Sequence, residues 1–237
     1  MQVLTLSLVI PCYNEVENLS SLLARCAEVC SAEPRIDVIL VDNGSLDGTQ
    51  EFLASSLLHP QISTIRVPVN RGYGFGILSG LQVAQGDIIG WSHADMQTDP
   101  MDVLSAFAKF EAASDARRIF VKGRRGERPF RDVVFTYAMS GFAMTILGLP
   151  LSDINAQPNL FHRDFVKSWE NPPHDFALDL FAYVHALQLG VEVRRVDVDF
   201  GTRVAGLGNN ERLLSKLRYS FRSALDIINL RKRLVSK

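Results

Sequence analysis

The amino-acid sequence predicts an α/β fold in which a mainly parallel central sheet is flanked by helices. Short apolar runs alternate with helical segments through the first 100 residues, which is the β-α-β order of parallel sheets. Residues 38–41 are apolar throughout and lie between Asp37 and Asp42, a pattern typical of a strand buried on both faces. With 237 residues and 47% hydrophobic content, the chain can bury one substantial core, so we expect a single domain.

The first 100 residues supply four expected strands and three expected helices. The strands are expected at residues 4–10, 38–41, 62–67 and 88–92, and the helices after Asn14, from Asp47 and over residues 75–84. We expect Pro11 to end the first strand and Asn14 to cap the first helix, whose first turn then carries Glu15 near the positive end of the helix dipole.

The order of elements is less regular beyond Pro100. We expect helices at residues 101–112, 133–147 and 176–189, and strands at 119–122, 159–162 and 191–200. The final expected element is an amphipathic helix at residues 212–230. No Pro- or Gly-rich linker divides the sequence, which again favours one domain.

Charge and cysteine content indicate the surroundings of the protein. The net charge is -1, but residues 211–237 carry eight Lys or Arg against two acids, so the C-terminal segment is cationic. We interpret Cys12, Cys26 and Cys30 as buried thiols rather than metal or redox ligands, because no Cys-x-x-Cys pair exists, and an odd count suits a reducing cytosol.

No apolar run approaches the roughly 20 residues of a membrane span, and the first run reads as a strand rather than a signal peptide. We therefore expect a cytoplasmic protein with no nucleic-acid partner.

Polar residues follow each of the first four expected strands. They are Pro11-Cys12-Tyr13-Asn14-Glu15, Asp42-Asn43-Gly44-Ser45, Asn70-Arg71-Gly72 and His93-Ala94-Asp95-Met96-Gln97. Ligands bind beyond the carboxyl ends of strands in open parallel sheets, so these segments should be read together. An aromatic ring, acids, small residues and an arginine at one edge suit a nucleotide with its phosphates. Each segment alone is equally compatible with a tight turn or a helix cap, and the glycines at residues 72–76 do not have the dinucleotide-binding spacing.

Taken in order, the four segments resemble the family 2 glycosyltransferases with the GT-A fold. The resemblance is to the polyprenol-phosphate branch, which is similar to dolichol-phosphate mannose synthase, and it covers the first 100 residues. The motifs that carry it are Val9-Ile10-Pro11-Cys12-Tyr13-Asn14-Glu15, Val41-Asp42-Asn43-Gly44-Ser45-Leu46-Asp47-Gly48-Thr49, Asn70-Arg71-Gly72-Tyr73-Gly74 and His93-Ala94-Asp95-Met96-Gln97-Thr98-Asp99-Pro100.

The resemblance implies a division of the single domain and a role for each motif. Residues 1–100 would bind the nucleotide sugar, residues 101–210 the acceptor, and residues 211–237 would form a basic C-terminal helix. The residues implied to bind the nucleotide are Pro11, Tyr13, Glu15, Asp42, Gly44, Arg71 and Gly72. Asp95 and Gln97 would bind Mg²⁺ or Mn²⁺, because a hard cation with oxygen ligands stabilises the charge that develops on a departing diphosphate.

His93 departs from the family pattern, which usually has an acid at this position. The imidazole could ligate Mn²⁺ or donate a hydrogen bond to phosphate, or it could only pack at the strand end while Asp95 and Gln97 bind the metal. A third alternative is a non-catalytic module that binds nucleotide sugars. These alternatives remain open from the sequence.

The acceptor side departs from the family as well. Relatives that glycosylate sugar hydroxyls usually carry a Glu-Asp pair whose aspartate is the general base. Here the comparable stretch is Asp175-Phe176-Ala177-Leu178-Asp179-Leu180, in which that pair is missing. An anionic acceptor such as a polyprenyl phosphate needs no base, so this acceptor is our first expectation. Asp175 or Asp179 could still act as the base for a hydroxyl acceptor, and Asp179 could equally be structural.

Several further residues could contact phosphate or sugar groups. Arg124, Arg131 and Arg203 either hold phosphates, which suits the planar arginine fork, or belong to a solvated face. Asn155 and Gln157 are expected to face the sugar. The C-terminal helix either closes the domain or contacts an anionic membrane surface, where a lipid-linked acceptor would lie.

The sequence therefore predicts a metal-dependent, inverting glycosyltransferase with a UDP- or GDP-type sugar donor. Its expected acceptor is a polyprenyl phosphate or another lipid-linked or polysaccharide intermediate, and we expect possible peripheral contact with the cytoplasmic membrane face. The alternatives are transfer to a sugar hydroxyl and the non-catalytic binding module.

Overall fold

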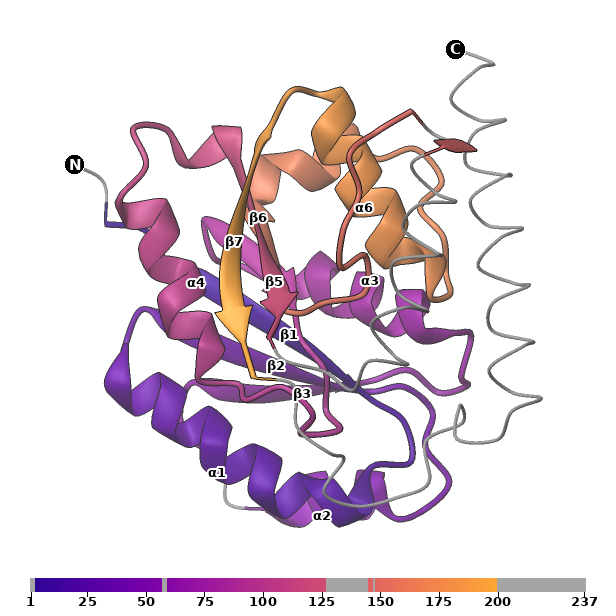
Figure 1. Ribbon diagram of the computed structural model, residues 1–237. Coiled ribbons are helices and arrows are strands. Elements are labelled where there is room, and N and C mark those ends of the chain that lie inside the picture. Colours follow the sequence, from indigo (N-terminus) through magenta and orange to yellow (C-terminus); the bar gives the residue numbers. More distant parts are fainter. Residues whose placement is uncertain (1–2, 57–58, 127–144, 147, 200–237) are drawn as a thin grey trace.

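The computed structural model describes residues 3–56, 59–126, 145–146 and 148–199 (Figure 1). The strands in this part of the chain are β1 (Leu6–Cys12), β2 (Ile36–Asp42), β3 (Ile62–Arg66), β4 (Ile88–Trp91), β5 (Ile119–Arg125), β6 (Asn159–His162) and β7 (Glu192–Val198). The α-helices are α1 (Val16–Ala32), α2 (Thr49–Ser55), α3 (Tyr73–Val83), α4 (Asp102–Glu111) and α6 (Ala177–Gln188). Two 3₁₀ helices, η1 (Ala116–Arg118) and η2 (Arg163–Ser168), complete the described elements.

The strands form one sheet in the order β3-β2-β1-β4-β6-β5-β7. Strand β1 pairs in parallel with β2 and β4, β2 with β3, and β5 with β7. Strand β6 alone among the described strands runs antiparallel to its neighbours β4 and β5. The mainly parallel sheet expected from the sequence is therefore confirmed, and the carboxyl ends of all described strands except β6 lie at one edge.

Helices cover both faces of the sheet (Figure 1). Alternate residues of the strands pack in one or the other of two cores, one on each face. Leu6, Leu8 and Ile10 of β1 pack in a core with α1, α2 and α4, whereas Val9 packs in a second core with α3 and α6. Because consecutive side chains of a strand point to opposite faces, a continuous apolar run such as that of β2 is what a sheet covered on both faces requires.

The connection between β1 and α1 differs from the expectation. Strand β1 continues through Pro11 to Cys12, and the first helix begins at Val16 after an N-cap at Glu15. Asn14 has a positive φ of 54° and accepts a hydrogen bond from the Leu46 amide through its Oδ1 atom (2.9 Å). Asn14 therefore joins the β1 and β2 loops to each other instead of capping α1.

The expected helices at 133–147 and 212–230 lie, except for residues 145 and 146, outside the described part of the chain. The three cysteines are free and buried, as expected, and burial raises the pKa of Cys26 to about 12 and that of Cys30 to about 11. Among the described residues, no helix has the length and apolar character that crossing a membrane requires.

Candidate active site

The register of the sheet brings the post-strand segments to one edge. Cys12 at the end of β1 lies beside Asp42 of β2, which lies beside Arg66 of β3. On its other side, β1 pairs with β4, which ends at Trp91 and leads directly into the His93–Gln97 segment. Three of the segments proposed from the sequence therefore follow neighbouring strands, and the edge they share is the candidate active site.

Asp42 and Asn43 place buried acceptor oxygens at this edge. Both side chains are nearly inaccessible, at 3% and 2% exposure. The Oδ1 atom of Asp42 accepts a hydrogen bond from the Ser45 amide (2.9 Å), and Nδ2 of Asn43 donates one to the Gly72 carbonyl (3.0 Å). Among the described residues, Oδ2 of Asp42 and Oδ1 of Asn43 have no hydrogen-bond donor. Nε of Arg66 lies 3.7 Å from Oδ2 of Asp42, as an ion pair. Buried acceptors of this kind are normally satisfied, so a ligand that supplies donors would be stabilised here.

The side chain of Tyr13 is open to solvent, whereas that of Glu15 is hydrogen-bonded within its own helix. Tyr13 is 42% exposed, so its ring is accessible. Oε2 of Glu15 accepts a hydrogen bond from Nδ2 of Asn18 (2.5 Å), in the first turn of α1, so this carboxylate is turned toward its own helix. Pro11 shapes the end of β1 beneath them.

Glycine is required at two positions of the site for steric reasons. Gly44 has a φ of +75°, and a Cβ atom there would lie 2.5 Å from the Asn70 amide nitrogen. Gly72 has a φ of +112°, and a Cβ atom would lie 2.2 Å from the His174 carbonyl oxygen. Any other residue would separate these backbone segments. Arg71, next to Gly72, places its guanidinium over the Phe75 ring at 4.3 Å.

The segment after β4 contains the expected metal ligands. Asp95 accepts a hydrogen bond from the Gln97 amide through Oδ1 (3.2 Å), and Met96 between them has a positive φ of 57°. Burial lowers the pKa of His93, an effect that the nearby carboxylates of Asp95 and Asp179 partly oppose. The imidazole is therefore neutral near pH 7 and keeps the lone pair that a metal ligand needs.

No group of three or more His, Cys, Asp or Glu side chains is placed to hold a metal ion in the part of the chain that the structure describes. The protein alone would thus offer Asp95, the amide oxygen of Gln97 and the imidazole of His93. This donor set fits a cation that takes most of its oxygens from elsewhere, as Mg²⁺ does when it binds one or two carboxylates together with substrate phosphates.

Asp179 lies at the centre of a buried hydrogen-bond network. Its Oδ1 atom accepts from Nε1 of Trp91 (2.9 Å), Nε2 of Gln157 (2.8 Å) and Nδ2 of Asn159 (2.8 Å). Asp179 is 1% exposed and Gln157 is 0% exposed. The Gln157 amide is used between Tyr73 of α3, Asn159 of β6 and Asp179, which disfavours the expected contact with a sugar. The contacts of Asp179 favour its interpretation as a structural acid.

Lys122 is part of the same network, although the sequence placed it only at the end of the expected strand 119–122 and indicated no role for it in the site. It is fully buried, and its ammonium donates to Oδ1 of Asn159 (2.7 Å) and to the Ala156 carbonyl (2.9 Å). Burial lowers its pKa to about 7, although Asp179 opposes this. The position of Lys122 in an apolar strand run, Ile119-Phe120-Val121, was the available signal that this cation points inward.

The other expected acceptor residues are engaged in separate contacts. Arg124 forms an exposed, bidentate ion pair with Asp197 of β7 (2.5 and 3.0 Å), which is a different use from the expected phosphate contact. The Asn155 carbonyl accepts from Arg125 (2.8 Å). Asp175 accepts from the Ala177 amide through Oδ1 (3.1 Å) at the start of α6. Arg131 and Arg203 lie outside the described residues.

Three rings are stacked beside the metal-ligand segment. The Tyr73 ring lies between His93 (centroids 5.6 Å apart, 28° between planes) and Phe176 (4.6 Å, 11°). Phe176 is 52% exposed, so it forms the open end of the stack. The hydroxyl of Tyr73 accepts a hydrogen bond from Nε2 of Gln157 (3.3 Å), which connects the stack to the buried network.

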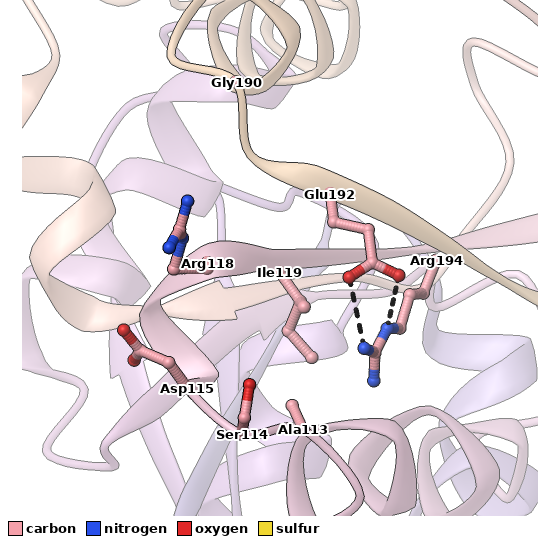
Figure 2. Close-up of a pocket in the computed structure, with 8 residues that line it drawn as sticks. All are labelled: Ala113, Ser114, Asp115, Arg118, Ile119, Gly190, Glu192 and Arg194. Carbon is pink, nitrogen blue, oxygen red and sulfur yellow. Dashed lines mark hydrogen bonds and ion pairs between the residues drawn. The ribbon is translucent and has the colours of Figure 1, made fainter.

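A shallow polar pocket lies at the opposite edge of the sheet (Figure 2). It is lined by Ala113, Ser114, Asp115, Arg118, Ile119, Gly190, Glu192 and Arg194, near the amino ends of β5 and β7. Figure 2 shows the Glu192 carboxylate paired with the guanidinium of Arg194. Since ligands of parallel sheets bind at the carboxyl edge, we do not assign the nucleotide to this pocket.

The fold and the polar carboxyl edge define an α/β protein whose ligand site lies beyond the carboxyl ends of its parallel strands. Comparison with protein families agrees: the model described as "Glycosyl transferase family 2" matches residues 7–179. The chain belongs to glycosyl transferase family 2.

The curated relatives are similar over a limited region. The undecaprenyl-phosphate 4-deoxy-4-formamido-L-arabinose transferase of Yersinia enterocolitica is 38% identical over 101 residues, which is 41% of this chain and 31% of the relative. The protein of the same name from Edwardsiella ictaluri is 36% identical over 100 residues, with the same coverage. The matched region is thus about a third of the length of these relatives.

Solved structures share the fold over nearly the whole chain. Glucosyl-3-phosphoglycerate synthase from Mycobacterium tuberculosis, in complex with Mn²⁺, UDP and phosphoglyceric acid, matches with a TM-score of 0.71 and 19% identity, covering 96% of this chain and 78% of that one. Mannosyl-3-phosphoglycerate synthase from Rubrobacter xylanophilus matches with a TM-score of 0.71 and 19% identity, covering 98% and 75%. At this identity the likeness shows the fold, and it confirms the expected GT-A type of architecture.

Proposed function

We propose that the protein transfers a sugar from a nucleoside diphosphate to a polyprenyl phosphate, with the help of a divalent metal ion. The observation that carries the proposal is the arrangement of the carboxyl edge, where buried acceptor oxygens of Asp42 and Asn43 and the segment with His93, Asp95 and Gln97 follow neighbouring strands. A nucleoside diphosphate sugar could bind with its nucleoside at Asp42 and Asn43 and with its diphosphate at the metal ion held by the segment after β4.

The nucleoside end of the donor is assigned to the β1 and β2 loops. A base and a ribose carry N–H and O–H donors, which Oδ2 of Asp42 and Oδ1 of Asn43 lack in the structure. The exposed ring of Tyr13 offers a stacking surface, and Gly44 and Gly72 keep the surrounding backbone compact. A solved structure of the same fold, glucosyl-3-phosphoglycerate synthase, contains UDP, which supports a uridine donor as the first one to test.

The diphosphate end is assigned to Asp95 and Gln97, with neutral His93 as a third possible ligand. A metal bound here would supply charge stabilisation to the departing nucleoside diphosphate. Mn²⁺ occurs together with UDP in the structural relative, and Mg²⁺ has the same preference for oxygen ligands. The acceptor oxygen would attack the anomeric carbon as the bond to the diphosphate breaks, and this single displacement inverts the configuration.

The burial and the hydrogen bonds of Asp179 favour a phosphate acceptor over a hydroxyl acceptor. A general base must reach the proton that it removes, but Asp179 is 1% exposed and its Oδ1 already accepts three hydrogen bonds. A phosphate oxygen is already anionic and needs no base. The names of the curated relatives, which are undecaprenyl-phosphate sugar transferases, support the same acceptor class.

Three arginines, which are Arg124, Arg131 and Arg203, are proposed from the sequence to bind the phosphate of the acceptor. Arg124 would have to exchange Asp197 for phosphate, which is feasible because the pair is exposed and exposed pairs contribute little. Arg131 and Arg203 remain proposals outside the described residues. The basic segment 211–237 is proposed to contact an anionic membrane surface.

The experiment is a transfer assay with undecaprenyl phosphate, Mn²⁺ and a panel of UDP- and GDP-sugars. We expect an acid-labile, alkali-stable lipid-phosphate sugar with at least one donor, and its loss in Asp95→Ala. Transfer to a glycan hydroxyl but not to the lipid phosphate would favour the alternative with Asp175 as base. Tight nucleotide binding without turnover of any donor would instead favour the non-catalytic binding module.

A further inference from the structure

Lys122 is the one fully buried lysine among the described residues. The ammonium donates to Oδ1 of Asn159 and to the Ala156 carbonyl, and it lies 5.6 Å from the centre of the Tyr183 ring. A buried charge is costly unless it is compensated. Here the compensating charge is Asp179, which is reached through Asn159.

In this network of hydrogen bonds, the chemistry of each group determines which group donates and which accepts. An ammonium can only donate, so Asn159 must present its oxygen to Lys122 and its NH₂ group to Oδ1 of Asp179 and Oε1 of Gln157. Gln157 must then present its own NH₂ group to Asp179 and to the hydroxyl oxygen of Tyr73. Lys122, which donates, and the carboxylate of Asp179, which only accepts, thus together decide which end of each amide faces the next residue.

We propose that Lys122 is a positioning residue, which together with Asp179 fixes Asn159 and Gln157 and through them holds the Tyr73 ring against His93 at the metal-ligand segment. The path consists of hydrogen bonds of 2.7 Å, 2.8 Å and 3.3 Å and ends in the stacked contact of Tyr73 with His93. Without the ammonium, Oδ1 of Asn159 loses its donor inside the protein, so only Asp179 still holds the Asn159 amide, and the contacts from Asn159 to Gln157 and from Gln157 to Tyr73 are loosened. The consequence for nucleotide binding rests on the function proposed above, whereas the path itself does not.

Charged groups from several elements surround Lys122, which is consistent with a lysine that acts through its neighbours. The groups that influence it electrostatically are Asp179 of α6, Arg195 of β7, Arg125 at the end of β5 and Asp153 of the loop before β6. Arg195 donates to the Tyr183 hydroxyl (2.6 Å) and to the Ser152 carbonyl (2.9 Å), so it closes the space above the lysine. Lys122 is therefore positioned to act on the site through its neighbours and not by touching a ligand.

The first test is a double-mutant cycle on stability with Lys122→Met and Tyr73→Phe. Hydrogen bonds through Asn159 and Gln157 join these two side chains. Independent effects on the urea midpoint would add, whereas members of one hydrogen-bond path couple. We expect the double variant to lose clearly less than the sum of the two single losses. The matched control is Tyr13→Phe combined with Lys122→Met, because Tyr13 lies outside the network; its losses should add. Additive losses for the Tyr73 pair would overturn the proposal.

The second test measures binding of UDP and of GDP with Mn²⁺ by calorimetry. We expect Lys122→Met to weaken binding by about tenfold, equivalent to ~1.4 kcal/mol, and to have little further effect in the Tyr73→Phe background. Lys167→Met, which removes an exposed lysine, is the control and should bind like the parent protein. Unchanged affinity in Lys122→Met would show that the network does not act on the site. If the parent binds neither nucleotide, the proposed function fails, while the stability cycle still decides the role of Lys122.

Discussion

At the scale of single residues, His93 is the feature that distinguishes this site. Its imidazole stacks on Tyr73, and burial lowers its pKa, so the ring is neutral near pH 7. A neutral imidazole provides a lone pair but no negative charge, which leaves Asp95 as the carboxylate of the His93–Gln97 segment. The site then depends on the nucleotide phosphates for most of the charge that balances a metal ion.

The substitution His93→Asp tests this view. We expect tighter Mn²⁺ binding, because a second carboxylate adds negative charge beside Asp95. We also expect a lower urea midpoint, because the stacked ring is lost and a charged group takes its half-buried place. Metal titration and urea unfolding measure the two effects, with His59→Asp as the control for an added acid elsewhere. If both metal affinity and activity stay at the parent level, His93 serves only for packing.

At the scale of elements, the starts of α3 and α6 are held together through the backbone. The Phe75 amide donates to the His174 carbonyl (3.0 Å), and Gly72 and Gly74 leave the space that this approach needs. The loop before α6, which carries Phe176 and Asp175, is thereby attached to the glycine-rich segment after β3.

Gly72→Ala should break this attachment. The positive φ of +112° and the 2.2 Å approach of a Cβ atom to the His174 carbonyl both disfavour alanine, so we expect a loss of more than about 2 kcal/mol in the free energy of unfolding. Gly190→Ala is the matched control, because it has a φ of +67° with open space around it and reports the backbone strain alone, about 1 kcal/mol. Equal losses in urea unfolding for the two variants would contradict the steric account.

The elements themselves were largely predictable from the sequence, but their contacts were not. The apolar run at 38–41 and the turn residues after it indicated β2, and the strand at 159–162 was expected with the observed bounds. The antiparallel direction of β6 and the burial of Gln157 depend on contacts with β4 and α6, far away in the sequence. Local pattern shows which residues follow a strand, whereas the partners of Lys122 and Asp179 are fixed only when the sheet and α6 pack together.

At the scale of the whole molecule, the buried lysine makes stability depend on pH. The pKa of Lys122 is lowered to about 7 in the folded protein from its ordinary value of 10.5, so the unfolded chain binds more protons between these values. The cost of burying the charge is fully present below pH 7 and is relieved as the pH rises, with a slope of up to about 1.4 kcal/mol per pH unit.

Urea unfolding of the parent and of Lys122→Met between pH 6 and 8.5 measures this effect. We expect the stability of the parent relative to the variant to rise with pH above about pH 7. The cysteines, whose raised folded pKa values lower stability at higher pH, are common to both proteins and cancel in the difference. A difference that does not change with pH would mean that Lys122 is not perturbed by burial.

The central claim is that the carboxyl edge of the sheet, and not the pocket at the opposite edge, binds a nucleoside diphosphate with a metal ion. Calorimetric titration of UDP and GDP in Mn²⁺ and in EDTA tests it directly, with Asp95→Ala compared with Asp115→Ala at the opposite edge. We predict binding that requires Mn²⁺, is weakened at least about tenfold by Asp95→Ala, and is unaffected by Asp115→Ala. Binding that is independent of the metal, or that Asp115→Ala weakens and Asp95→Ala does not, would contradict the account.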